Sequence, residues 1–126
     1  MPIEVRYRHE PDHVVVTFGG AGSVDDFLSA LQEVGADSVA WPGSHVIVDL
    51  RGLSTTYTFT EQLRIGEAVG RNLGHLQRVA AVVPPERVTR VGEKVANRTG
   101  ARAHVFTTEE DAIAWLREGQ KPSTPE

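Results

Sequence analysis

Hydroxyl side chains are concentrated in one short stretch of the sequence. The segment VIVDLRGLSTTYTFTEQ, residues 46–62, opens with β-branched residues, reaches the acid Asp49, and continues into five hydroxyl residues and a tyrosine. These six residues are Ser54, Thr55, Thr56, Tyr57, Thr58 and Thr60. Three roles suit such a cluster: a chemical site, a regulatory phosphoacceptor, or the turn that starts a helix.

Thr58 and Glu61 have the spacing of a capping box. In that motif a Thr side chain accepts a hydrogen bond from the backbone three residues on, and a Glu side chain accepts one in return. The residues alone favour this structural interpretation, because such caps are common. The alternative uses the same geometry, since a phosphate on Thr58 would place negative charge beside the N–H donors and positive dipole end of a helix. Thr58 is therefore also the candidate phosphoacceptor.

Other residues with chemical potential do not form a catalytic pattern. Asp49 ends an expected strand, where α/β proteins place their sites, and is a candidate general base, but no second polar group with a defined role accompanies it. The glycine turn FGGAGSVDDF lacks the Gly-Lys-Ser/Thr of a phosphate-binding loop, and Asp25 and Asp26 would repel a phosphate there. The sequence has no Gly-x-Ser-x-Gly elbow. We therefore predict no catalytic residue and expect that the protein is not an enzyme.

We predict neither a metal site nor a cofactor. The chain has no cysteine, which excludes disulfides, thiolate zinc sites and cysteine nucleophiles. Its five histidines lack the HExxH or HxH spacing of metal ligands. His9 and His13 flank a predicted turn, but two imidazoles without a third ligand make a poor metal site.

Length and charge narrow the class of protein further. The chain has 126 residues and a formal net charge of −4. This length fits one domain, and a mildly acidic chain lacks the positive charge of a nucleic-acid binder. The first residues contain no apolar run of a secretory signal, and the longest apolar runs fall far short of the roughly 20 residues of a membrane span. We expect a cytoplasmic protein with neither a nucleic-acid partner nor a membrane span.

The apolar pattern predicts alternating strands and helices. The predicted strands are residues 3–7, 13–18, 45–49, 78–83 and 102–106, and the helices start at Ser23, Thr58, the Pro84–Pro85 pair, and Thr107 or Thr108. In the second helix, we expect Leu63, Ala68 and Val69 to face inward. The order β-β-α-β-α-β-α-β-α predicts a single α/β domain over residues 1–118, with a mixed sheet of about five strands. Residues 119–126 are predicted to form a disordered tail.

The chain resembles the STAS-like fold group (sulfate transporter and anti-sigma factor antagonist). It is most similar to small bacterial STAS-like proteins that are sometimes linked to the CRAL-TRIO lipid-binding fold. The similarity covers nearly all of residues 1–117 and rests on the order of elements and on the segments HVIVDLRGLS, RVAAVV and VFTTEEDAIAWL. Anti-sigma antagonists of this group carry Asp-Ser-x-Gly after the strand, and a partner kinase phosphorylates the Ser. In LSTTYTFTE these three positions fall on Tyr57, Thr58 and Thr60, so only the hydroxyl is retained, as a threonine.

The resemblance implies a non-catalytic regulatory module that binds a protein partner through the loop and helix start at residues 52–61. The residues expected in this surface are Arg51, Ser54, Thr56, Tyr57, Thr58 and Thr60, with Arg51 available to pair with an acidic group. The alternative is a carrier of a small apolar or anionic ligand, with Trp41, Tyr57 and Phe59 lining a pocket between a helix and the sheet. Similar small proteins are often dimers, so a homodimer is a further expectation.

Overall fold

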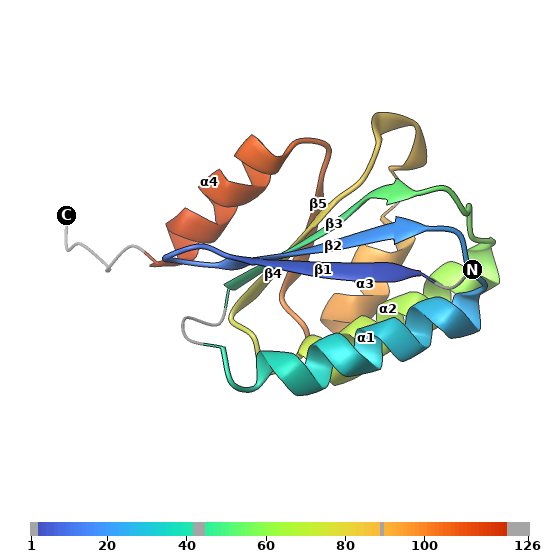
Figure 1. Cartoon of the computed structure of the whole chain (residues 1–126), viewed down its shortest axis with the longest axis horizontal. Coiled ribbons are helices and arrows are strands. Elements are labelled where there is room, and N and C mark those ends of the chain that lie inside the picture. The colour runs from blue at the N-terminus through green and yellow to red at the C-terminus, as the bar shows by residue number, and fades with distance from the viewer. Residues whose placement is uncertain (1–2, 42–44, 89, 121–126) are drawn as a thin grey trace.

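The computed structural model describes residues 3–41, 45–88 and 90–120, and this part of the chain forms five strands and four helices (Figure 1). The strands are β1 (Glu4–His9), β2 (Val14–Gly20), β3 (His45–Leu53), β4 (Arg78–Val82) and β5 (Ala103–Phe106). The helices are α1 (Val24–Ser38), α2 (Phe59–Leu73), α3 (Val91–Thr99) and α4 (Glu109–Gln120). The predicted order of strands and helices is confirmed.

The strands form one mixed sheet in the order β1-β2-β3-β4-β5. β1 pairs antiparallel with β2, as the predicted hairpin requires, and the remaining neighbours are parallel. The carboxyl ends of parallel strands meet at one edge of a sheet. The loop after β3 and the segment after β4 therefore leave the sheet side by side.

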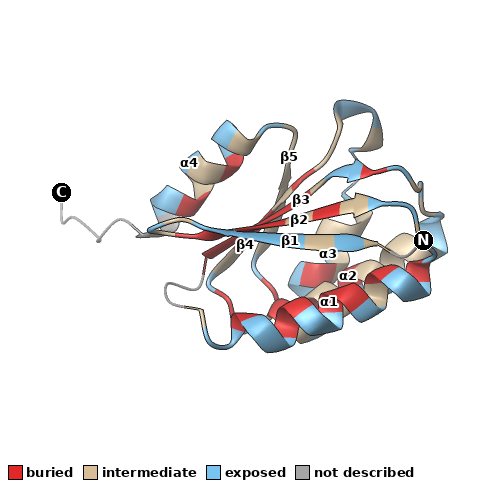
Figure 2. Ribbon diagram, viewed as in Figure 1, coloured by how far each residue is buried: buried red, intermediate tan, exposed pale blue. Residues whose placement is uncertain are grey.

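Helices cover the two faces of the sheet unequally. α1, α2 and α3 lie on one face and α4 on the other (Figure 1). The larger core cluster joins α1 and α2 to alternate residues of β2 and β3, such as Val16 and Val48, whereas the smaller one joins α4 to Val15 and Ile47 on the opposite face (Figure 2). This alternation is the period-2 pattern of strands that are buried on both faces. None of the described helices combines the length and the apolar character needed to cross a bilayer.

Two helix boundaries differ from the prediction. After Pro84 the chain makes only a short 3₁₀ turn, Pro85–Arg87, and Val88 is extended, so α3 begins at Val91. α4 follows Thr108, whose Oγ1 accepts a hydrogen bond from the Asp111 N–H at 3.1 Å. The helix continues to Gln120, and the rest of the expected tail, residues 121–126, lies outside the described residues.

Candidate functional site

The loop between β3 and α2 is tied to the turn that follows β2. Both the backbone N–H and the side-chain hydroxyl of Ser54 donate to the Gly20 carbonyl, at 3.0 and 3.2 Å. One residue later, Thr55 Oγ1 accepts a hydrogen bond from the Gly22 N–H at 3.1 Å. Gly20 has a φ of 88°, a backbone conformation that glycine adopts without steric cost. The loop is therefore held in a defined position at the carboxyl edge of the sheet.

Thr58 is the N-cap of α2, as its spacing with Glu61 predicts. Its Oγ1 accepts a hydrogen bond from the Glu61 N–H at 3.2 Å, and its own N–H donates to Glu61 Oε1 at 2.9 Å. α1 begins in the same way, because Ser23 and Asp26 exchange the same two bonds at 3.2 and 3.1 Å. A capped helix start thus occurs twice, so the cap by itself does not mark a functional site.

The residues predicted for the binding surface fall into three environments: exposed hydroxyls, the half-buried Tyr57, and Arg51, which lies apart from them. Ser54, Thr56, Thr58 and Thr60 are exposed along the loop and the first turn of α2. Tyr57 is half-buried: its ring stacks on Phe27 with centroids 5.7 Å apart, and its hydroxyl donates to the Gly22 carbonyl at 3.4 Å. Burial raises the pKa of Tyr57, and the carboxylates of Glu61 and Asp26 raise it further. Tyr57 therefore anchors the loop to α1, while the hydroxyls around it face solvent.

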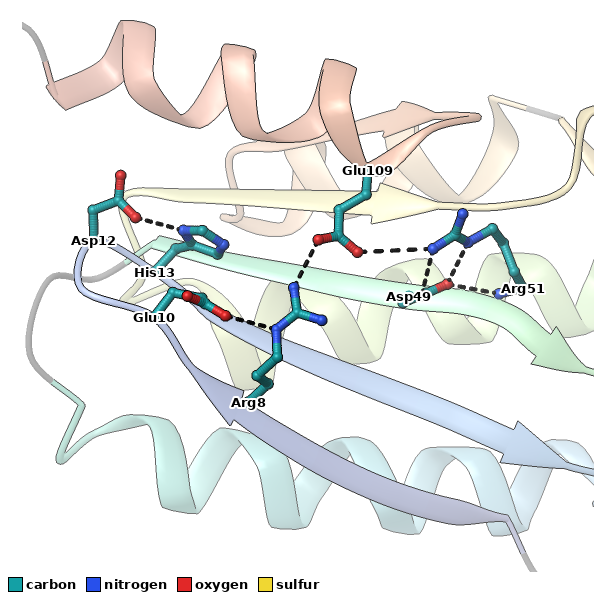
Figure 3. A network of polar contacts seen from close by, with 7 residues as sticks. All are labelled: Arg8, Glu10, Asp12, His13, Asp49, Arg51 and Glu109. Carbon is teal, nitrogen blue, oxygen red and sulfur yellow. Dashed lines mark hydrogen bonds and ion pairs between the residues drawn. The ribbon is translucent and has the colours of Figure 1, made fainter.

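Arg51 lies apart from the hydroxyl residues, on the α4 side of the sheet (Figure 3). Its guanidinium binds both carboxylate oxygens of Asp49, at 3.0 and 2.9 Å, and lies 3.8 Å from Glu109. Glu109 in turn accepts a hydrogen bond from Arg8 of β1 at 2.7 Å. Arg51 is therefore engaged in a charge network that links β1, β3 and the start of α4.

Asp49 lacks the raised pKa that a general base at this position would need. Burial by itself raises the pKa of Asp49, but the hydrogen bonds from the Arg51 side chain and backbone outweigh it, and the pKa lies below its ordinary value. A base that works near neutral pH needs a raised carboxyl pKa. The geometry instead assigns Asp49 a structural role as the partner of Arg51.

A cavity of about 310 Å³ lies between the sheet and helices α2 and α3. Its walls are mostly apolar and come from β3, β4 and β5, with Ile65 and Val69 of α2 and Phe27 and Leu31 of α1 on the helix side. Thr55, Thr56 and Tyr57 of the loop after β3 line it on one side, and the segment that contains Arg87 lines it on another. An Arg87 N–H donates to the Leu53 carbonyl, which joins the two sides. The predicted binding loop is therefore also a wall of a cavity.

This cavity differs from the pocket proposed for a carrier. Of the three residues expected there, only Tyr57 lines it. Trp41 follows α1 at the opposite end of the sheet and packs against Tyr7 and His9, with ring centroids 5.2 and 5.8 Å apart. Phe59 points outward, with 63% of its surface exposed. The prediction of Trp41 and Phe59 as lining residues was wrong. Trp41 precedes β3 whereas the loop follows it, and the first turn of α2 directs Phe59 to solvent.

The histidine side chains make ring contacts and hydrogen bonds in different parts of the fold and do not converge as metal ligands would. His9 packs on Trp41, whereas His13 lies on the other side of the turn with Nδ1 2.7 Å from Asp12 Oδ1. His75 Nε2 lies 2.8 Å from Ser38 Oγ. Within residues 3–41, 45–88 and 90–120, no group of three or more His, Asp or Glu side chains is placed to hold a metal ion.

Comparison with known proteins places this architecture in a family. Residues 13–117 match the model of the SpoIIAA-like family. Two solved structures share the fold, and each is matched over 91% of this chain and 94% of the other. One is an anti-sigma factor antagonist from Mycobacterium paratuberculosis, with 19% identity and a TM-score of 0.63. The other is an uncharacterized protein of the DUF3478 family with a SpoIIAA-like fold, from Shewanella loihica PV-4, with 18% identity and a TM-score of 0.54.

No curated protein matches the chain. The family match and the shared fold confirm the STAS-like resemblance that the sequence indicated. Because the matched residues span most of the folded domain, the chain belongs to the SpoIIAA-like family.

Proposed function

We propose that the protein is a non-catalytic regulatory module that binds a partner protein through the loop and helix start at residues 52–61. The observation that carries this proposal is a set of exposed hydroxyls on a loop whose position is already defined. Thr56 and Thr60 face solvent, while Ser54 and Thr55 tie the same loop to the β2–α1 turn. A preorganised loop loses little conformational freedom on binding, which favours its use as a docking surface.

Phe59 gives this surface an apolar element. It is exposed between Thr58 and Thr60, at the first position of α2. Aromatic side chains are enriched at the centres of protein interfaces, where hydroxyls supply hydrogen bonds around them. The fold that the chain shares with an anti-sigma factor antagonist supports a protein partner, which is why we prefer this function to the others.

Phosphorylation of Thr58 would regulate this surface through charge. The Glu61 carboxylate lies 2.9 Å from the Thr58 nitrogen, so a phosphate on the hydroxyl would be placed beside another negative group. Like-charge repulsion would then open the capping box and change the docking surface. Thr58→Glu mimics this change, and Ser23→Glu applies the same change to the matching cap of α1 as a control.

The test is capture of the partner from native lysate, followed by mass spectrometry. Thr56→Arg and Thr60→Arg place a large charged side chain on the surface without touching the cap. Ser29→Arg makes a comparable change at an exposed position of α1. We expect a protein that wild type and Ser29→Arg retain and that the two threonine variants lose. Retention of the same proteins by all four would contradict the proposal.

A second candidate is a small-molecule carrier of the same fold. The cavity of about 310 Å³ favours it, because ligand sites in proteins begin at roughly this size and have mainly apolar walls. Native mass spectrometry of the purified protein tests this candidate directly. A carrier would retain a small molecule through purification, whereas a module that only docks to a protein would show the mass of the chain alone.

A further inference from the structure

The cavity exposes side chains that belong to the interior face of the sheet. Ala81 of β4, Val83 just after it and Val105 of β5 line the cavity and are only partly buried. Beside α1, Val16 and Phe18 on the same face of the sheet are completely buried. Apolar surface that stays open within a bounded pocket is typical of a ligand site.

Small residues account for this hollow. A Cβ on Gly66 would lie 2.8 Å from the Gly92 carbonyl oxygen and 2.8 Å from Val95 Cβ. α2 and α3 thus approach each other closely at Gly66, where a side chain would point at α3. On the sheet side, Ala81 and Ala103 fill little of the space between the layers. The small side chains of the two strands therefore leave room for the cavity beneath the closely packed helices.

A few polar side chains interrupt the apolar lining of the cavity. Arg87 is one of them, and it donates one hydrogen bond to the Leu53 carbonyl, which holds the guanidinium in place. A guanidinium has five N–H donors in a fixed plane, so this bond leaves it able to bind an acceptor. Thr56 belongs to the same lining, and so do the acids Glu86 and Glu93. The Glu93 carboxylate already accepts hydrogen bonds from Arg90 and from the Val105 N–H, at 3.0 and 2.7 Å. An apolar lining that includes a guanidinium suits a molecule that is apolar along most of its length and polar at one end.

We propose that the cavity binds an amphipathic molecule, with its apolar body inside and a hydrogen-bond-accepting end at Arg87, and that its occupancy regulates docking at residues 52–61. This inference rests on the proposed function, because the regulated surface is the docking loop. Thr55, Thr56 and Tyr57 belong both to that loop and to the cavity wall. A ligand packed against them adds contacts that stabilise the loop in the position that the partner binds. The ligand and the partner must then strengthen each other's binding by the same factor.

Decanoate and decanol are suitable probes, because they share an apolar chain and differ at the polar end. Each is titrated into the ¹⁵N-labelled full chain, and binding is followed by NMR. We expect shifts at the amides of Ile65, Ala81 and Ala103. Saturating decanoate should slow amide hydrogen exchange in the loop from Thr55 to Tyr57. Arg87→Gln should weaken decanoate binding more than decanol binding, since the carboxylate loses a charged donor.

Two cavity-filling variants and one matched control separate binding from folding. Ala81→Leu and Ala103→Leu extend a side chain into the cavity, and Ala114→Leu makes the same change at an exposed position of α4. Each filled variant that retains wild-type circular dichroism should bind decanoate at least about tenfold more weakly, while Ala114→Leu binds as wild type does. Undiminished binding in both filled variants, or unchanged loop exchange in the saturated wild type, would overturn the proposal. Neither result bears on docking itself, which the capture experiment decides separately with Thr60→Arg, because Thr60 does not line the cavity.

Discussion

Helices α1 and α2 begin alike and pack differently. Each has 15 residues, follows the carboxyl end of a strand, lies on the same face of the sheet and starts with a complete capping box. The inward face of α1 carries Phe27, Leu31 and Val34, which are buried against the sheet, although Phe27 and Leu31 also border the cavity. The buried positions of α2 include Gly66 and Gly70, and Gly66 lines the cavity.

The difference shows that the capping sequence of a helix does not determine how tightly the helix packs on the sheet. Both helix starts satisfy their backbone donors, so neither is a functional site on that ground. What distinguishes the start of α2 is its position, because its exposed hydroxyls lie on the loop that also forms a cavity wall. Candidate sites in such a fold are better sought where the core is incomplete than where a helix is well capped.

The largest expected effect is on stability, when one apolar side chain of each helix is truncated to alanine. Leu31→Ala removes a completely buried side chain of α1 and should lower the free energy of unfolding by about 2–5 kcal/mol. Both side chains line the cavity, but Ile65 of α2 is only partly buried, so Ile65→Ala should cause a clearly smaller loss. Urea denaturation of both variants measures the difference. Equal losses would mean that the region beneath α2 is packed as tightly as the region beneath α1.

The second prediction concerns two glycines that face each other across α2 and α3. Gly66→Ala should lower the free energy of unfolding by about 1–3 kcal/mol, because its Cβ would overlap the Gly92 carbonyl and Val95. At Gly92 the nearest atom to a Cβ is the Gln62 carbonyl oxygen at 3.8 Å. Gly92→Ala should therefore stabilise by about 0.5–1 kcal/mol, since alanine favours the helical backbone. Thermal unfolding of the pair checks the opposite signs, and a stabilising Gly66→Ala would show that the helices can separate freely.

The third prediction uses the matching caps. Thr58→Ala and Ser23→Ala each remove one side-chain acceptor, and each should lower the free energy of unfolding by about 1 kcal/mol. Partner capture should respond to Thr58→Ala and not to Ser23→Ala once both proteins are confirmed as folded. A partner that is lost to the same extent with either variant would mean that capture reports stability alone.

The smallest expected effect is a change in the pH dependence of stability, and it comes from the Asp49–Arg51 pair on the α4 face of the sheet. Because the pKa of Asp49 is lowered in the folded protein, its pairing with Arg51 stabilises the fold above the ordinary carboxyl pKa of about 4. That contribution should be lost as the pH falls through the lower folded pKa. Asp49→Asn should therefore weaken the dependence of stability on pH in the acid range. Asp25→Asn, at an exposed ion pair with Arg64, is the control and should change this dependence less.

The fold was predictable because its signals are local. Alternating apolar residues indicated the first strand and continuous apolar runs indicated later ones, and Ser23 and Thr58 identified two helix starts that the structure confirms. The inward face of α2 was predicted as Leu63, Ala68 and Val69. Ala68 and Val69 are partly buried and pack against the core, whereas the fully buried positions are Gly66, Gly70 and Leu73. A glycine is buried there only because α3 lies against it. That contact is between distant parts of the chain, so the cavity could not be predicted from periodicity.

The place of Arg51 shows a signal that was available. The predicted strand ended at Asp49, but β3 continues to Leu53. In a strand, residues two apart point to the same face. Had the strand been extended, Arg51 would have been placed beside Asp49 on the α4 side and apart from the hydroxyl cluster, as the structure has it.

Photo-crosslinking tests the docking surface most directly. A photoreactive amino acid replaces Thr60 in one protein and Ser29 in another, both at exposed positions of helices on the same face of the sheet. After irradiation in native lysate, we predict a specific protein adduct from position 60 that position 29 does not form. Identical adduct patterns from the two positions, or no protein adduct from position 60, would contradict the account.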